Sequence, residues 1–210
     1  MYLPYAFFIV LMLAVAVYVI SNSKWRGRSD KFAELTAREK QANDSRKKPI
    51  PENLFFVPDL NVIPFKIDEK GLPKSVSELL ERLRTTGQKK MLQLQSGMTN
   101  TEIKEAFGLV NLEFVTEYEE RFNIFLRLLN DLAEEYLKIS KIDYAEAALD
   151  LCVSLRCDIS RTYTMLADIY AERGAREELD KLSDRLLDTD MQEAFKSKVS
   201  DYIITKKRGI

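Results

Sequence analysis

Histidine is absent from this chain of 210 residues, and cysteine occurs only twice, as Cys152 and Cys157. Without imidazole the chain has no Ser-His-Asp or Cys-His nucleophile system and no zinc site that needs a histidine ligand. Two cysteines are too few for a four-cysteine metal site. The two cysteines lie at or just beyond the end of a predicted helix, and we expect them to act as small apolar side chains in a reducing compartment. The sequence predicts no catalytic residues, no cofactor and no metal.

Familiar phosphate- and cation-binding motifs are missing as well. The seven glycines are scattered and form no P-loop, dinucleotide-binding fingerprint, nucleophile elbow or calcium loop. Acidic pairs such as Glu119-Glu120 fall within predicted helices, where adjacent side chains point about 100° apart and do not make a dyad. Their expected place is a solvated helix face. We therefore predict that the protein is not an enzyme.

The near-neutral net charge of −1 hides an asymmetry along the chain. Residues 22–48 carry nine basic and four acidic side chains, which leaves 23 basic and 29 acidic side chains for residues 49–210. A basic segment therefore precedes an acidic body.

The chain begins with 19 uncharged residues, 2–20, rich in Leu, Val, Ile and Phe. As a helix this run would nearly span the ~30 Å hydrocarbon core of a bilayer, so we predict a transmembrane signal anchor over residues 1–21. A cleaved signal peptide is the alternative, but the positive n-region is missing. Because Lys24, Arg26 and Arg28 follow the run and nothing basic precedes it, the expected orientation is N-out and C-in. The body would then be cytoplasmic, in a bacterial plasma membrane or on the mitochondrial outer membrane.

Two segments of different character follow the anchor. Residues 22–48 are predicted to be a basic juxtamembrane linker, with a short helix over Ser29–Asn43 and a loose connection at 45–48. Residues 49–74 hold most of the prolines, whose density excludes an ordinary helix and predicts an extended segment. Its large apolar side chains at 54–65 either pack against the helical body or await a partner.

Residues 75–210 are predicted to form an α-helical domain. Ser75–Glu78 and Thr99–Glu102 have the capping-box spacing that starts a helix. Between them, the first helix is expected to end near Gly87 and residues 89–95 to form a short turn. Apolar residues at steps of three or four predict further helices. Their expected ranges are 112–139, 144–155, 160–173, 176–188 and a last helix ending near 205.

Residues 97–109 look like the first half of a DNA-binding helix-turn-helix motif. The helix that follows should then be basic, because it must neutralise phosphates. Instead it carries Glu113, Glu117, Glu119 and Glu120 before its first arginine. We therefore predict no nucleic-acid binding.

One helical pattern occurs twice, 34 residues apart: Leu129, Leu132, Ala133 and Tyr136 recur as Tyr163, Leu166, Ala167 and Tyr170. Two antiparallel helices with their turns use about 34 residues. The stretches LNDLAEEYLKISKIDYAEAALDLCV and YTMLADIYAERGAREELDKLSDRLL resemble the tetratricopeptide repeat, although the early tryptophan and the late proline are missing. The resemblance implies an all-α fold, a short solenoid of helical hairpins with units at about 126–159 and 160–193. Two ordinary amphipathic hairpins of equal length are the alternative.

In tetratricopeptide repeats the exposed face of each first helix lines a groove for protein ligands. The resemblance places on that face Asn130, Glu134, Lys138, Arg161, Thr164, Asp168 and Glu172. Their mixed charges favour a polar peptide with some basic character. The expected function is a membrane-anchored scaffold or adaptor that binds a protein partner at the cytoplasmic face. A structural subunit of a membrane complex, docking through residues 54–65, is the alternative.

Overall fold

The computed structural model describes residues 10, 12, 13, 17, 18, 30–63 and 72–210, and they are mostly helical, which confirms the all-α class. Residues 30–43 are helical, and the following helices are α2 (Lys74–Gly87), α3 (Asn100–Phe107), α4 (Leu112–Lys138), α5 (Ile142–Ser154), α6 (Ser160–Glu172), α7 (Arg176–Leu187) and α8 (Glu193–Arg208). The chain divides into two compact units. The small unit comprises residues 1–48 and 99–112, and the large unit comprises residues 49–98 and 113–210.

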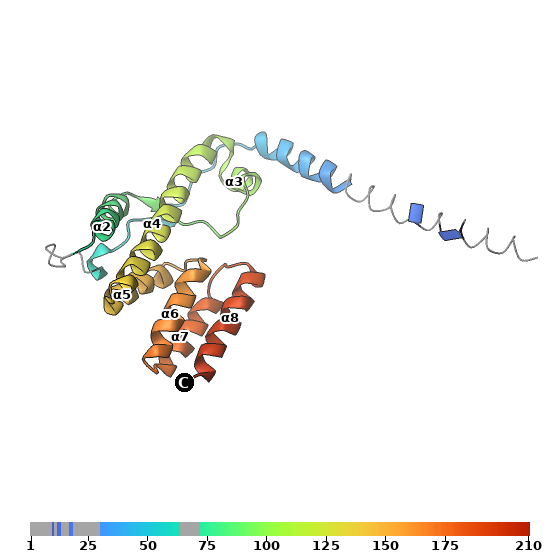
Figure 1. Ribbon diagram of the computed structural model, residues 1–210. Coiled ribbons are helices and arrows are strands. Elements are labelled where there is room, and N and C mark those ends of the chain that lie inside the picture. Colours follow the sequence, from blue (N-terminus) through green and yellow to red (C-terminus); the bar gives the residue numbers. More distant parts are fainter. Residues whose placement is uncertain (1–9, 11, 14–16, 19–29, 64–71) are drawn as a thin grey trace, which may run out of the picture. The chain divides into compact units, whose positions relative to one another are not determined.

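Helices α4 to α8 form most of the large unit, and their predicted bounds are confirmed to within a few residues. Helix α6 packs against α5, α7 and α8, and Figure 1 shows α6, α7 and α8 side by side. Apolar residues at steps of three and four place one stripe of each helix in a common core. Leu129, Leu132 and Leu166 in that core are completely buried.

The turns that end α4 and α6 have the same geometry. Lys141 N–H donates to Tyr136 O at 2.9 Å, and Ala175 N–H donates to Tyr170 O at 2.8 Å. Each turn also contains a residue with positive φ, Ser140 at 57° and Gly174 at 66°. This hydrogen bond and a left-handed residue are the marks of the Schellman helix ending.

The proline-rich segment contains a short helical turn (Glu52–Leu54), strand β1 (Phe55–Phe56) and a second turn (Leu60–Val62). Strand β1 pairs antiparallel with β2 (Met91–Leu92), so the predicted turn at 89–95 is wrong at these two residues. They are fully buried, and the strand pairing satisfies backbone groups that burial would otherwise leave unpaired.

The same segment packs within the large unit as far as residue 63. Phe56 meets the ring of Phe122 edge-on at 5.5 Å, and Ile63 is only 3% exposed. Leu60 lies against Gly87, where a Cβ would come within 2.8 Å of its methyl group. Of the two alternatives for 54–65, packing against the helical body is seen for Phe56, Leu60 and Ile63, and residues 64–71 lie outside the described part of the chain.

One of the two predicted capping boxes is wrong. Helix α2 begins at Lys74 with Pro73 as its N-cap and no side-chain cap, and the Ser75 hydroxyl donates instead to Glu135 at 2.5 Å. Pro73 suits the N-cap because the N–H that it lacks would make no bond within the helix there, and its ψ of 146° is extended. The box at α3 is confirmed: Thr99 N–H donates to Glu102 at 2.8 Å, and Glu102 N–H donates to Thr99 Oγ1 at 3.3 Å.

The predicted membrane anchor over residues 1–21 falls mostly outside the described residues. Five positions of the run are described, and all five are helical with side chains 61–71% exposed. Within the described part of the chain, no helix combines the length and the apolar character that a membrane span requires.

Candidate functional site

The seven residues predicted to line a groove lie on α4 and α6, and one of them is not exposed. Asn130 is 3% exposed, so its predicted position on the open face of α4 is wrong. Its Nδ2 donates to Leu126 O, and its Oδ1 accepts a hydrogen bond from Thr162 Oγ1, both at 2.9 Å. A buried amide needs such partners, and Asn130 finds them because it points from α4 toward α6.

Glu134, Lys138 and Arg161 form a charged group that joins α4 to α6. The Arg161 guanidinium pairs with Glu134 and lies 3.7 Å from Asp131. Lys138 Nζ is 3.4 Å from Glu134 and 2.6 Å from Glu135. All these side chains remain partly exposed, so their charges are available to a ligand that can replace these pairs.

Asp168 makes the corresponding connection between α6 and α8. It accepts a hydrogen bond from Tyr202 OH at 2.8 Å and pairs with Lys206 Nζ at 2.6 Å. The hydrogen bond with Asp168 raises the pKa of Lys206 above its ordinary value, so the lysine stays charged. Sequence reasoning missed Tyr202 and Lys206, yet they stand 34 positions after Asp168 and Glu172, and continuing the repeat by one period would have found them.

These residues define a first-helix face on α4, α6 and α8. Thr164 lies on it with its hydroxyl donating to Arg161 O at 3.1 Å, and Glu172 is exposed. Its members are Glu134, Lys138, Arg161, Thr164, Asp168, Glu172, Tyr202 and Lys206. Six of the seven predicted residues are therefore brought onto one polar face, without the buried Asn130.

A separate polar cavity of about 100 Å³ lies in the large unit, lined by ten residues: Gln93, Leu94, Ser96, Gly97, Glu119, Phe122, Asn123, Arg156, Asp158 and Asp190. Glu119 was expected on a solvated helix face, but burial, followed by the charge of Asp158, raises its pKa. The Ser96 hydroxyl donates to Asp158. Within the described residues, no group of three or more Cys, Asp or Glu side chains is placed to hold a metal ion.

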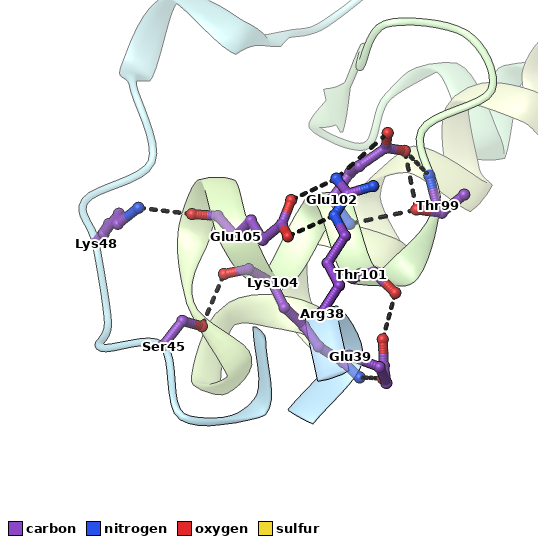
Figure 2. A network of polar contacts seen from close by, with 9 residues as sticks. All are labelled: Arg38, Glu39, Ser45, Lys48, Thr99, Thr101, Glu102, Lys104 and Glu105. Carbon is purple, nitrogen blue, oxygen red and sulfur yellow. Dashed lines mark hydrogen bonds and ion pairs between the residues drawn. The ribbon is translucent and has the colours of Figure 1, made fainter. Parts of the chain in front are cut away.

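The small unit contains a network of charged contacts between the 30–43 helix and α3 (Figure 2). The Arg38 guanidinium donates to both carboxylate oxygens of Glu105, at 2.7 and 2.6 Å. Glu39 accepts hydrogen bonds from Thr101 and Lys104. These bonds hold the charged forms, so Arg38 lowers the pKa of Glu105 and Lys104 lowers the pKa of Glu39.

The connection at 45–48, predicted to be loose, is bound to α3 by both side chains and backbone. Ser45 Oγ donates to Lys104 O at 2.8 Å, and Lys48 N–H donates to Phe107 O at 3.1 Å. Gly108 has φ 87°, and a Cβ there would lie 2.4 Å from the carbonyl oxygen of Arg46. Only glycine allows the two backbone segments to approach this closely.

Comparison of the chain with protein-family models, with curated proteins and with solved structures found no match. Function is therefore inferred from the residues and contacts of the two units alone. Of the three polar groups of side chains, the first-helix face spans the most helices and contains most of the residues that the repeat pattern indicated.

Proposed function

We propose that the protein is a membrane-anchored, tetratricopeptide-like scaffold or adaptor that binds a protein partner at the cytoplasmic face of a membrane and has no catalysis of its own. The observation that carries the proposal is the agreement of sequence period and structure. Leu132 and Ala133 are 0% exposed, as are Leu166 and Ala167, their counterparts 34 positions later. Ser140 and Gly174, which supply the left-handed turns, are 34 positions apart too.

The partner's chemistry follows from the first-helix face. Apart from Glu172, its charged side chains are about half exposed and already paired, so a ligand must offer charges of its own to replace these pairs. Glu172 is exposed at the end of α6 and has no hydrogen bond or ion pair among the described residues, so it is ready to accept a basic group. A polar, partly basic peptide segment of another protein fits this surface best.

The anchor would contribute by concentrating the body at the bilayer. The 19-residue apolar run and the basic residues that follow it support an N-out, C-in single-pass anchor. A partner confined to the same membrane then meets the first-helix face at a high effective concentration, which raises avidity without new contacts.

Site-specific photo-crosslinking in native membranes tests this proposal. A photoreactive amino acid at Thr164 or Glu172 is expected to crosslink one protein, which mass spectrometry identifies. The matched control is the same amino acid at Asp184, an exposed position on α7. Crosslinks of equal yield from Asp184, or none from either groove position, would reject the first-helix face as the binding surface.

The alternative, a subunit of a membrane complex that docks through residues 54–65, also has an observation in its favour. The segment packs inward through Phe56 and Ile63, but Val57 and Val62 are 57% and 52% exposed. Two exposed valines on a fixed backbone offer a small apolar contact. Crosslinks from Val57 and Val62 in place of Thr164 and Glu172 would favour this alternative.

A further inference from the structure

The turn after α5 brings the only two cysteines of the chain together. Cys157 N–H donates to Cys152 O at 3.2 Å, Arg156 N–H donates to Val153 O at 3.0 Å, and Arg156 has φ 53°. This is again the Schellman ending, in which the residue beyond the turn returns to contact the residue five positions earlier. After α4 this backbone hydrogen bond joins Tyr136 and Lys141, and after α6 it joins Tyr170 and Ala175. After α5 it joins two cysteines.

A chain of polar contacts links the two thiols. Asn130 Nδ2 donates to Cys152 Sγ at 3.5 Å, and Cys157 Sγ donates to Thr162 Oγ1 at 3.4 Å. Thr162 Oγ1 in turn donates to Asn130 Oδ1 at 2.9 Å, so the bonds form a chain from Cys152 to Cys157 across α4, α5 and α6, and Cys152 Sγ itself donates to Leu126 O at 3.8 Å. Both cysteines are free, with side chains 0% and 1% exposed.

The surroundings make the two thiols unequal. Burial raises the pKa of Cys152 well above its ordinary value, whereas interaction with Cys152 lowers the pKa of Cys157. Cys157 is therefore the thiol more readily deprotonated, and the thiolate is the form that reacts. A more acidic cysteine whose backbone is hydrogen-bonded to that of a second cysteine is an arrangement suited to disulfide formation.

We propose that Cys152 and Cys157 are a redox-active pair that hydrogen peroxide converts into an intramolecular disulfide and that a thiol reductant restores. The sulfur of Cys157 attacks the peroxide: an S–O bond forms, the O–O bond breaks, and the leaving hydroxide takes the thiol proton as water. The sulfur of Cys152 then attacks the Cys157 sulfur, so that the S–S bond forms, the S–O bond breaks and a second water leaves. Two thiols lose two electrons, and one peroxide becomes two waters.

Oxidation acts at the contact between the two repeat units. The disulfide removes the protons that Cys157 donates to Thr162 and Cys152 donates to Leu126 O, and so alters the chain of hydrogen bonds that links α4 to α6. A disulfide across so short a loop constrains the unfolded chain little, which keeps it easily reduced. Reaction requires the turn at 155–159 to open, and the exposed Arg156 and Asp158 on either side of Cys157 place that turn at the surface. The proposal is independent of membrane anchoring and of any partner.

The cleavage site of trypsin gives a direct readout, because Arg156 lies between the two cysteines. Full-length protein in mild detergent is treated with hydrogen peroxide, unfolded, alkylated and digested. A disulfide then appears as two tryptic peptides joined through Cys152 and Cys157. The undigested protein, weighed before alkylation, is lighter by two hydrogens. Dithiothreitol reverses both changes.

Wild-type protein unfolded in urea and oxidised in the same way is the control for chemical competence. The Cys157→Ser variant is expected to give no joined peptides. The comparison of folded with unfolded wild-type protein does not depend on whether this variant folds. Two thiols that stay alkylatable in folded protein while the unfolded chain oxidises would overturn the proposal. So would products limited to sulfinic acids or to disulfides between two chains.

Discussion

The large unit and the small unit differ in the kind of contact that stabilises each of them internally. In the large unit, α4 to α8 share an apolar core in which many side chains are fully buried. In the small unit, the 30–43 helix buries only Ala42 among its own side chains and attaches to α3 through charged pairs, while Phe32 and Leu35 are 73% and 62% exposed. Burial of apolar surface contributes far more free energy than exposed ion pairs do, so the large unit should be the more stable.

The largest expected effect follows from a tyrosine in the core of the large unit. Tyr136 is 0% exposed and belongs to the repeat pattern. Tyr136→Ala should lower the free energy of unfolding by roughly 3 to 5 kcal/mol, because it leaves a cavity that the neighbouring helices fill only in part. Chemical denaturation followed by circular dichroism measures the change.

The matched control for that variant is Tyr136→Phe. Among the described residues the Tyr136 hydroxyl is buried without a hydrogen-bond partner, so removing it should leave stability unchanged or slightly increased. If Tyr136→Ala unfolds at the wild-type midpoint, the assignment of this residue to a repeat core is wrong.

A backbone contact supplies the next effect, in the small unit. Gly108→Ala places a Cβ 2.4 Å from Arg46 O at a φ of 87°, so 45–48 must move away from α3. We expect a local loss of about 3 kcal/mol, from strain and from lost backbone hydrogen bonds. Hydrogen exchange at the Lys48 amide measures it. Gly97→Ala is the control, because Gly97 has φ 80° but open space around it. An equal loss of stability in the two variants would show that the short distance to Arg46 O is not the cause.

Removing a buried polar group in the large unit should lower the free energy of unfolding more than removing an exposed one in the small unit. Asn130→Ala deletes the acceptor of the Thr162 hydroxyl and should cost about 2 kcal/mol, since a buried donor is then left unpaired. Denaturant midpoints measure the loss, and Thr162→Val in the same background shows whether the two residues act as a pair. Fully additive effects of the two changes would contradict the bond between them.

The smallest effect distinguishes the two units by the sign of their response to pH. Glu39 and Glu105 have a pKa below the ordinary value of 4.5, so their contribution to stability is present above pH 4.5 and is lost as the pH falls through the lower folded pKa. Glu119 and Asp150 have raised pKa values, chiefly from burial. Their contribution is complete below the ordinary values of 4.5 and 3.8 and is lost as the pH rises through the folded pKa.

On acidification, the 30–48 segment should therefore lose protection below about pH 4.5, whereas α4 and α5 should gain a little as Glu119 and Asp150 take up protons. Hydrogen exchange followed by mass spectrometry, corrected for the intrinsic rate at each pH, reports on peptides from both units. Glu105→Gln is the control and should reduce the response of the small unit alone. Simultaneous loss of protection in both units would contradict the opposite signs.

Sequence analysis succeeded where the physical cause is local. The apolar period of 3.6 residues predicted α4 to α8, because burial of one stripe decides where a helix lies. It failed at β2, since two buried residues show no alternation and their partners in β1 are 35 and 37 positions away. Asn130 was misplaced because a repeat position does not show how far a helix is rotated toward its neighbour. Arg38 pairs with Glu105, and Lys104 pairs with Glu39. Each pair joins residues more than 60 positions apart, and no local pattern indicates it.

The small unit is made of two pieces of chain with residues 49–98 between them, and this has a consequence for synthesis on the ribosome. Asn43 and its partner Lys104 are 61 positions apart. At about 5 to 20 residues per second, translation needs roughly 3 to 12 s to pass from one to the other. For that time Arg38 and Glu39 on the 30–43 helix have no α3 to pair with. The nascent chain therefore presents its basic, partly apolar segment to its surroundings before the small unit can close.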